Sequence, residues 1–265
     1  MYSKSRDPAL RELMSTSADA EKLRQSHDAQ RRTIDAVLGF LTHSDIPHEY
    51  HHRSELKDIP DFHRYSLVIT VGGDGTFLEA SHYVHGIPML GVNSDPASSV
   101  GYFSAANAQT FADCIRTIGD MPRTTLARMA IERNGQRIPE YVLNDVLLAN
   151  ENPADTTRFY LNGEKKKRVN SGLIVCTPAG STGWMKNVGG IVMPLDAQEL
   201  QYRERDAPAP AWGFAKQLEA YSLTRPGKMY VDGAHLVYPF TLYDTIRFSL
   251  GEPLTVLGDL NQKRK

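Results

Sequence analysis

The apolar and polar positions of the chain follow two different periods, with the change near residue 120. In the first part, helical patterns cover residues 17–42, 76–84 and 108–118, and strand-like runs cover residues 66–71 and 88–92. Strands that alternate with helices are typical of an α/β unit with a parallel sheet. Val37 and Leu41 share the apolar face of the first helix, so we expect this helix to pack by its second half.

After Pro122 helical periodicity nearly disappears, and alternating segments predict a mostly β second part. Asn134-Gly135 and Asn162-Gly163 are hairpin signals, because these residue types accept the positive φ angles of tight turns. The predicted strands cover residues 124–133, 142–149, 158–161, 172–177, 228–231, 236–241 and 245–250. Residues 198–217 carry prolines and mixed charges, and they are predicted to form a loop or short helix across the surface.

Composition indicates a folded globular protein. The 265 residues are 41% hydrophobic and 23% charged, which excludes disordered, collagen-like and coiled-coil chains. The net charge of −1 gives no basic field for nucleic acid or a membrane surface, so an anionic ligand must be held locally. No apolar run approaches the ~18 residues of a membrane span, and the first residues lack a signal-peptide core. Cys114 and Cys176 have no CxxC spacing, which is typical of a reducing compartment.

A glycine-rich turn follows the first strand-like run: Gly72, Gly73, Asp74, Gly75 and Thr76. Glycines let backbone N–H groups approach a phosphate closely, and a helix N-terminus adds partial positive charge. A carboxylate repels phosphate, so Asp74 needs a separate role, such as accepting a proton from a hydroxyl nucleophile. The structural alternative is that Asp74 caps the helix and the glycines only close a turn.

A second cluster of small residues follows the strand predicted at 172–177, where side chains and backbone can approach a ligand. Four motifs occur in order: GGDGT at 72–76, LND at 143–145, TPAGSTGW at 177–184 and VDG at 231–233. Together they resemble the NAD kinase family over roughly residues 60–255. GVNSDP at 91–96 resembles the mitochondrial-type branch of that family. GGDGT alone is also found in diacylglycerol and sphingosine kinases and in relatives of phosphofructokinase.

The resemblance implies an α/β N-terminal domain with a parallel, Rossmann-like sheet and a β-rich C-terminal domain. We expect a nucleotide-binding domain over residues 1–120 and a dinucleotide-binding domain over residues 121–250. Residues 251–265 form a C-terminal segment, for which a return to the first domain is left open. The implied reaction transfers the terminal phosphate of ATP to the adenosine ribose 2′-hydroxyl of NAD, giving NADP, with Mg²⁺ arriving on ATP.

The resemblance also implies roles for individual residues. Asp74 matches the general base, and Asn144 with Asp145 matches the pair that holds the dinucleotide, where Asp145 replaces the usual Glu. Trp184 replaces a Tyr that lines the adenine and ribose pocket. The expected ligand-binding residues are Gly72, Gly73, Gly75, Thr76, Asn93, Asn144, Asp145, Thr177, Gly180, Ser181, Thr182, Gly183 and Trp184.

The expected partners are ATP and NAD, with a homodimer or homotetramer and neither nucleic acid nor membrane. The expected compartment is the cytoplasm, or the mitochondrial matrix if a transit peptide has been processed. Two features depart from the family: residues 1–16 contain no β-branched apolar run, so we expect the usual first strand to be absent, and Ser171 replaces an Asp. The alternatives are a lipid or other hydroxyl kinase of the GGDGT group, and an NAD-binding pseudo-enzyme. NAD versus NADH and ATP versus polyphosphate are left open.

Two other signals do not point to a site. His48, Glu49 and His52 spell HExxH, but the surrounding residues lack the helical pattern that a zinc protease requires. Lys263 and Arg264 are predicted to lie in a frayed end, and His82 is predicted to be a surface or packing residue.

Overall fold

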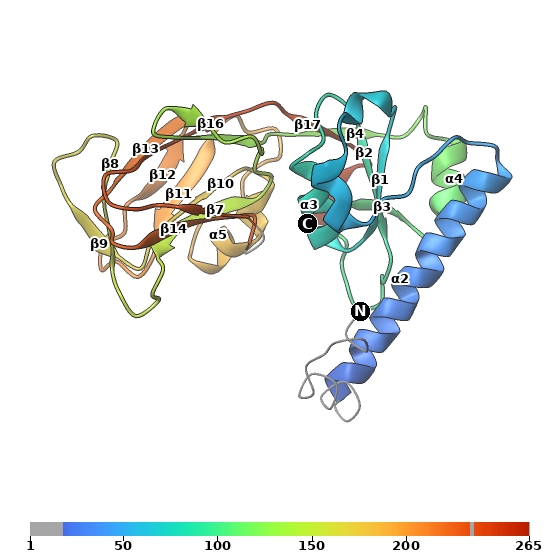
Figure 1. The fold of residues 1–265 in the computed structure, drawn as a ribbon, viewed down its shortest axis with the longest axis horizontal. Helices are drawn as coiled ribbons and strands as arrows, with labels where there is room; N and C mark the ends of the chain where they lie inside the picture. The colour runs from blue at the N-terminus through green and yellow to red at the C-terminus, as the bar shows by residue number, and fades with distance from the viewer. Residues whose placement is uncertain (1–17, 234–235, 265) are drawn as a thin grey trace.

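The computed structural model describes residues 18–233 and 236–264. Figure 1 shows two lobes, one with helices packed on a sheet and the other made mostly of β-strands. The prediction that a first strand is absent falls on residues 1–16, which lie outside the described residues.

The α/β lobe contains a five-stranded sheet in which β2 pairs with three neighbours. Its strands are β1 (Val68–Gly72), β2 (Met89–Asn93), β3 (Ser104–Asn107), β4 (Arg123–Leu126) and β17 (Leu254–Leu257). β1, β3 and β17 run parallel to β2, while β4 pairs antiparallel with β17. The predicted α/β unit with a parallel sheet is confirmed. Gly72 pairs with Asn93, so the loops after β1 and β2 leave from the same edge of the sheet.

Helices accompany this sheet in the order that the sequence predicts. They are α2 (Ala18–His43), α3 (Asp74–Ser81) and α4 (Phe111–Arg116), with the 3-10 turns η2 (Arg53–Asp58) and η3 (Phe62–Arg64). Val37 and Leu41 are buried beside Leu90 and Phe111, so α2 packs by its second half as expected. Among the helices that the structure describes, none has the length and apolar character needed to cross a lipid bilayer.

The β lobe consists of two six-stranded sheets, ordered β12-β11-β10-β7-β14-β15 and β6-β5-β16-β13-β8-β9. All pairs in both sheets are antiparallel, and one apolar core that includes Val146, Phe159 and Phe248 contains residues of both sheets. The strands are β5 (Met129–Arg133), β6 (Gln136–Arg137), β7 (Asp145–Asn150), β8 (Thr157–Leu161), β9 (Arg168–Asn170), β10 (Leu173–Cys176), β11 (Leu200–Glu204), β12 (Trp212–Ala215), β13 (Gln217–Ser222), β14 (Gly227–Val231), β15 (Leu236–Pro239) and β16 (Thr245–Leu250). Short helical turns are η4 (Gly180–Thr182), α5 (Trp184–Asn187) and, at the C-terminal end, η5 (Leu260–Arg264).

Both predicted hairpin turns are confirmed. Asn134 and Gly135 separate β5 from β6 with φ angles of 53° and 79°, and Asn162 and Gly163 follow β8 with φ angles of 50° and 68°. These are the left-handed conformations that favour Asn-Gly.

Two predictions about strands are wrong, and further strands are missing from the predicted set. Residues 198–217 are not a loop or short helix, because β11 and β12 form a hairpin there and the prolines lie between them. The buried polar residues Gln201 and Glu204 conceal the strand pattern of β11. Residues 124–133 are two strands, with β4 in the first sheet and β5 in the β lobe. The strands that the sequence pattern does not predict include β3, which is made of small residues, β9, β13 and β17.

The sheets do not follow the expected domain limits residue by residue. β4 begins at Arg123 and β17 at Leu254, and both belong to the sheet of the α/β lobe. The division at residues 120/121 and 250/251 concerns domains rather than sheets, and it stays a prediction.

Arg128 connects the two lobes from a fully buried position between β4 and β5. Its guanidinium donates hydrogen bonds of 2.8 Å to the carbonyls of Ser81, Val84 and Glu252, and so caps the C-terminal end of α3. Burial lowers the pKa of Arg128 to about 10, with the charge of Glu252 opposing the shift.

We expect Arg128→Met to lower the free energy of unfolding by about 3–5 kcal/mol, because three carbonyls lose their donor and those of Ser81 and Val84 are buried. Urea denaturation measures this loss. Arg116→Met, at an exposed arginine of α4, is the control and is expected to change stability by less than about 0.5 kcal/mol. Equal effects of the two substitutions would contradict the role given to Arg128.

Candidate functional site

The glycine turn lies between β1 and α3. Gly72 ends β1, Gly73 is the N-cap of α3, and Asp74 is its first residue. A Cβ atom at Gly72 would lie 2.4 Å from Thr76 Oγ1, so the Thr76 side chain requires glycine at this position. A Cβ at Gly75 would meet nothing within 4 Å. The N–H groups of Thr76 and Phe77 donate to Gly73 O, so the donors left at the open side of the turn are the backbone N–H groups of residues 73–75.

The carboxylate of Asp74 is held by the loop that follows β2. Oδ2 accepts a 2.9 Å hydrogen bond from the backbone N–H of Tyr102, and Oδ1 accepts one of 2.9 Å from Phe103. Asp74 is half-buried, and each oxygen keeps acceptor capacity beyond its one backbone donor. The Lys263 ammonium lies close enough for the charge of Asp74 to act on it: burial lowers the pKa of Lys263, and Asp74 opposes that shift. The carboxylate is therefore fixed in orientation beside a cation.

Asn93 shapes the loop that reaches Asp74. Its side-chain amide donates to Ser99 O at 2.9 Å, and its oxygen accepts from Asp95 N at 3.1 Å. Gly101 has a φ of +56°, and a Cβ there would lie 2.5 Å from Asn93 Nδ2. Asn93 thus fixes the conformation of the loop, and both ends of its side-chain amide form hydrogen bonds within the chain.

The second cluster of small residues packs directly against the LND segment. Thr177 donates from its N–H to Asn144 O at 2.9 Å and from Oγ1 to Leu143 O at 2.5 Å. A Cβ at Gly180 would lie 2.1 Å from the Asn144 carbonyl oxygen. The structure therefore brings the two motifs together, and glycine at 180 allows their backbones to touch.

Asp232, from the VDG segment, holds the backbone of the LND segment. Its carboxylate accepts hydrogen bonds from the N–H groups of Leu143, Asn144 and Asp145 at 2.9, 2.7 and 2.9 Å. Burial, reinforced by the charge of Asp232, raises the pKa of Asp145 from 3.8 to about 7. Within the described residues the Asn144 side chain, which is half-buried, has no hydrogen bond, so its amide is available to a ligand.

The remaining residues of the second turn divide into structural and accessible ones. Ser181 is buried, donates to Pro178 O at 2.7 Å and accepts from Met193 N at 2.9 Å, so its hydroxyl supports the turn. Gly183 and Trp184 are exposed at the start of α5. The Arg205 guanidinium lies 5.1 Å from the centre of the Trp184 ring, a cation–π contact on the predicted stacking surface.

Three contacts join the two halves of the site. Phe77 of α3 shares an apolar cluster with Leu143 and Ala179 of the β lobe. His82 Nε2 lies 2.9 Å from Asp232 Oδ2. Arg264 donates to the Tyr102 hydroxyl and to the carbonyls of Pro178, Ala179 and Met193. Figure 1 shows the C-terminus ending beside α3, between the lobes.

Sequence reasoning missed both polar bridges. The prediction of a frayed end at Lys263 and Arg264 is wrong, because the carbonyls of both lobes bind these cations. The bridging role of His82 has no local signal, since its partner lies 150 residues away.

The HExxH letters do not form a site. Residues 48–52 are irregular, and Glu49 instead contacts Arg64 and Tyr65. Among the described residues, no group of three or more His, Cys, Asp or Glu is arranged to hold a metal ion.

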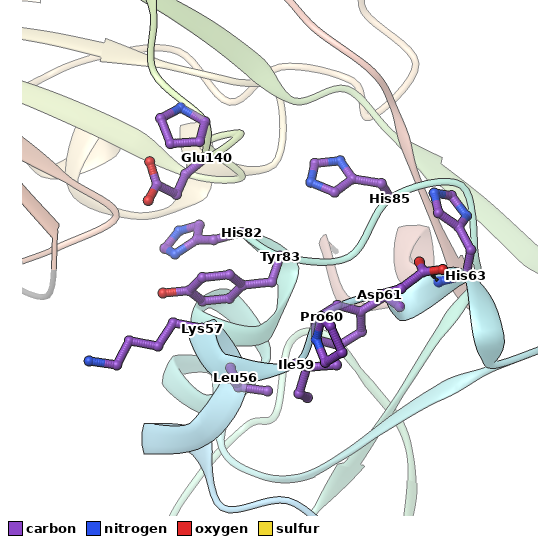
Figure 2. Close-up of a pocket in the computed structure, with 12 residues that line it drawn as sticks. Leu56, Lys57, Ile59, Pro60, Asp61, His63, His82, Tyr83, His85 and Glu140 are labelled. Atoms are coloured by element: carbon purple, nitrogen blue, oxygen red, sulfur yellow. Dashed lines mark hydrogen bonds between the residues drawn. The ribbon is translucent and has the colours of Figure 1, made fainter.

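A cavity of about 390 Å³ lies at the other end of α3, away from the glycine turn. Figure 2 shows His82 and Tyr83 in it, with Glu140 nearby. None of the expected ligand-binding residues lines this cavity. Its connection with the site is His82, which also contacts Asp232.

The raised pKa of Asp145 makes stability depend on pH. The folded state binds this proton more tightly than the unfolded state, so Asp145 destabilises the fold increasingly as pH rises from about 4 to about 7. We expect Asp145→Asn to gain stability relative to the unmodified protein between pH 5 and pH 8, by at most about 3 kcal/mol. Urea denaturation at both pH values measures the difference, and a difference that does not change with pH would contradict the assignment.

Comparisons with known proteins show which chains this protein is similar to. The family model described as ATP-NAD kinase N-terminal domain matches residues 9–120. A probable NADH kinase of Oryza sativa subsp. japonica is 38% identical over 228 residues, which cover 72% of this chain and 70% of that protein. The NADH kinase of Arabidopsis thaliana is 34% identical over 227 residues, covering 71% of each chain. The crystal structure of an NAD kinase from Archaeoglobus fulgidus in complex with ATP has a TM-score of 0.67 at 16% identity, over 94% of this chain and 93% of that chain.

Proposed function

The chain belongs to the NAD kinase family, and from this premise we propose that it transfers the terminal phosphate of ATP to the adenosine ribose 2′-hydroxyl of NAD, giving NADP. The observation that carries the proposal is the assembly of the glycine turn, the LND segment and the small-residue turn around the junction of the lobes. Phosphoryl transfer depends mainly on positioning and charge neutralisation, and this junction offers both.

In the proposed reaction Asp74 accepts the proton of the 2′-hydroxyl as that oxygen attacks the terminal phosphate. The amides of Tyr102 and Phe103 hold both carboxylate oxygens, so the base keeps its orientation. General bases of this kind contribute about 10²–10⁴-fold to rate.

The phosphates of ATP are proposed to lie on the open side of the glycine turn, at Gly73, Gly75 and Thr76. Gly73 and Gly75 offer backbone N–H groups there, and Thr76 offers its hydroxyl, because its own N–H donates to Gly73 O. The proposed Mg²⁺ arrives with ATP. The site fits an ion bound mostly by phosphate oxygens and water, because Asp74 is the carboxylate at the turn and both of its oxygens already accept backbone hydrogen bonds. When bound, Mg²⁺ supplies neutralisation of phosphate charge.

The dinucleotide is proposed to lie against the LND segment. The Asn144 amide is available to a ribose hydroxyl, and Asp145 gains an acceptor role when it loses its proton. Thr182, Gly183 and Trp184 are proposed to border the same surface, because they follow Gly180, which packs against Asn144. The Trp184 ring is proposed as a stacking face for adenine.

NADH is a second candidate acceptor. Two of the relatives reported above are named as a probable NADH kinase and an NADH kinase. In both cases the alignment with this chain covers more than two thirds of the relative's length. The reduced nicotinamide ring is remote from the 2′-hydroxyl that reacts, so the same chemistry serves both dinucleotides.

The remaining proposals come from the family resemblance. They are a cytoplasmic or mitochondrial-matrix location and a homodimer or homotetramer. The exposed Trp212 and Phe214 of β12, at the edge of one sheet, offer apolar surface to a second copy.

The test is a coupled assay on the purified protein with Mg²⁺, in which NAD and NADH are each offered with ATP or polyphosphate. NADP or NADPH is quantified by an NADP-specific dehydrogenase. We expect product with ATP and at least one dinucleotide. The absence of product from every pairing would refute the proposed function, and tight NAD binding without turnover would favour a pseudo-enzyme.

A further inference from the structure

We propose that His82 is a positioning residue for the phosphoryl transfer, acting through Asp232 to set the LND segment at a fixed place relative to Asp74. The inference rests on the proposed function for its catalytic consequence and on the contacts of the structure for its mechanism.

The His82–Asp232 contact is enclosed by protein. The two side chains are 2% and 0% exposed, and the nitrogen and oxygen are 2.9 Å apart. His82 is the C-cap of α3, and Asp232 follows the last residue of β14. The contact therefore crosses from the helix of the glycine turn to the β lobe.

The direction of this hydrogen bond follows from the other partners of Asp232. Its carboxylate already accepts three backbone N–H groups of the LND segment, on both oxygens. An ionised carboxylate has no proton to donate, so the hydrogen bond to Asp232 Oδ2 needs a donor. His82 Nε2 therefore carries the proton and donates it. His82 Nδ1 is buried and has no hydrogen-bond partner among the described residues. A buried unpaired nitrogen is unfavourable, so histidine is a poor choice for packing alone, and the Asp232 contact gives it a role.

Helix α3 connects the His82–Asp232 contact to Asp74, the proposed general base. Asp74 and His82 stand at opposite ends of α3, about 12 Å apart at a rise of 1.5 Å per residue. A straight helix of this length is stiff, so fixing His82 on Asp232 fixes Asp74 relative to Asn144 and Asp145. Reacting groups that are displaced by about 1 Å lose on the order of 10²-fold in rate. Figure 2 shows His82 at the end of this helix.

The experiment compares His82→Gln, His82→Asn and His82→Met. Gln places an amide donor near the position of Nε2, Asn is too short to reach Asp232, and Met fills the space without a donor. We expect Asn and Met to lower kcat by about 10–100-fold with KM for both substrates within about threefold, and Gln to retain most of kcat. His85→Asn, on the same side of the lobe and bound to Glu252 rather than Asp232, is the matched control and should keep the kcat of the unmodified protein.

Hydrogen exchange provides a readout that does not depend on turnover. In His82→Asn and His82→Met we expect the amides of Leu143, Asn144 and Asp145 to exchange at least about tenfold faster, because Asp232 loses its anchor to α3. Inactivity of the unmodified protein would refute the proposed function, while this exchange difference would still support the anchoring role. The inference would be overturned by unchanged hydrogen exchange at these amides, by an effect on KM without an effect on kcat, or by equal losses of kcat in the Gln and Asn variants.

Discussion

Asp74→Asn lowers kcat by about 10²–10⁴-fold, the range expected when a general base is removed, while the protein remains folded. The amide oxygen of Asn still accepts one of the two backbone hydrogen bonds now made by Asp74, so the loop at Tyr102 and Phe103 keeps part of its support. The side chain can no longer take a proton from a hydroxyl. Initial rates with saturating ATP and NAD measure the loss, and circular dichroism confirms the fold.

Asp95→Asn is the matched control for this result. Asp95 lies on the loop after β2, and its carboxylate accepts from the Ser98 hydroxyl rather than from the amides that bind Asp74. We expect kcat within about threefold of the unmodified protein, because neither proposed substrate contact is lost. If Asp74→Asn were as active as Asp95→Asn, proton transfer to Asp74 would be excluded.

Gly180→Ala is expected to cost about 3–5 kcal/mol of stability and to abolish measurable NAD binding. The new Cβ would lie 2.1 Å from Asn144 O and 2.5 Å from its carbonyl carbon. Both are backbone atoms of a residue held at two points, because its oxygen accepts from the Thr177 N–H and its own N–H donates to Asp232. Relief requires the small-residue turn to separate from the LND segment. Urea denaturation measures the first effect and calorimetric titration with NAD the second.

Gly39→Ala is the control for the chemical change itself. Gly39 lies within α2, where a Cβ meets nothing within 4 Å, so alanine is expected to raise stability by about 0.5–1 kcal/mol through helix propensity. A stable Gly180→Ala protein with intact NAD binding would contradict the contact between the two motifs.

The elements predicted from the sequence are those whose signals are local. The alternation of β1, α3, β2 and α4 and the two Asn-Gly hairpins depend on periodicity and on backbone angles that short segments impose. The sequence does not predict β11, because polar residues such as Gln201 and Glu204 are typical of a surface segment, whereas here they are buried. The backbone N–H and carbonyl of Ile191 form hydrogen bonds with the Gln201 side chain. The Ala211 N–H donates to the Glu204 carboxylate, and the Arg168 guanidinium lies 3.6 Å from it. These polar residues therefore have partners inside the fold and do not mark a surface loop.

The candidate site also has features that the sequence predicts and features that only the folded structure shows. The motifs identified the residues at the junction, but not what their side chains contact. Asn93 and Ser181 hydrogen-bond within their own loops, and this follows from folded geometry alone. The bridges made by His82 and Arg264 join residues that are far apart in the chain, so no pattern within a window of sequence reveals them.

The place of β17 in the sheet governs the order of folding during synthesis. β17 lies between β2 and β4, so the sheet of the α/β lobe lacks an inner strand until residues 254–257 have left the ribosome. The two sheets of the β lobe are complete by the end of β16 at Leu250. The part of the chain made second is therefore expected to fold first, and α3 meets Asp232 only when the last strand is inserted. A chain that ends at residue 253 and has been released from the ribosome would be protected from proteolysis in the β lobe and cleaved in the α/β lobe.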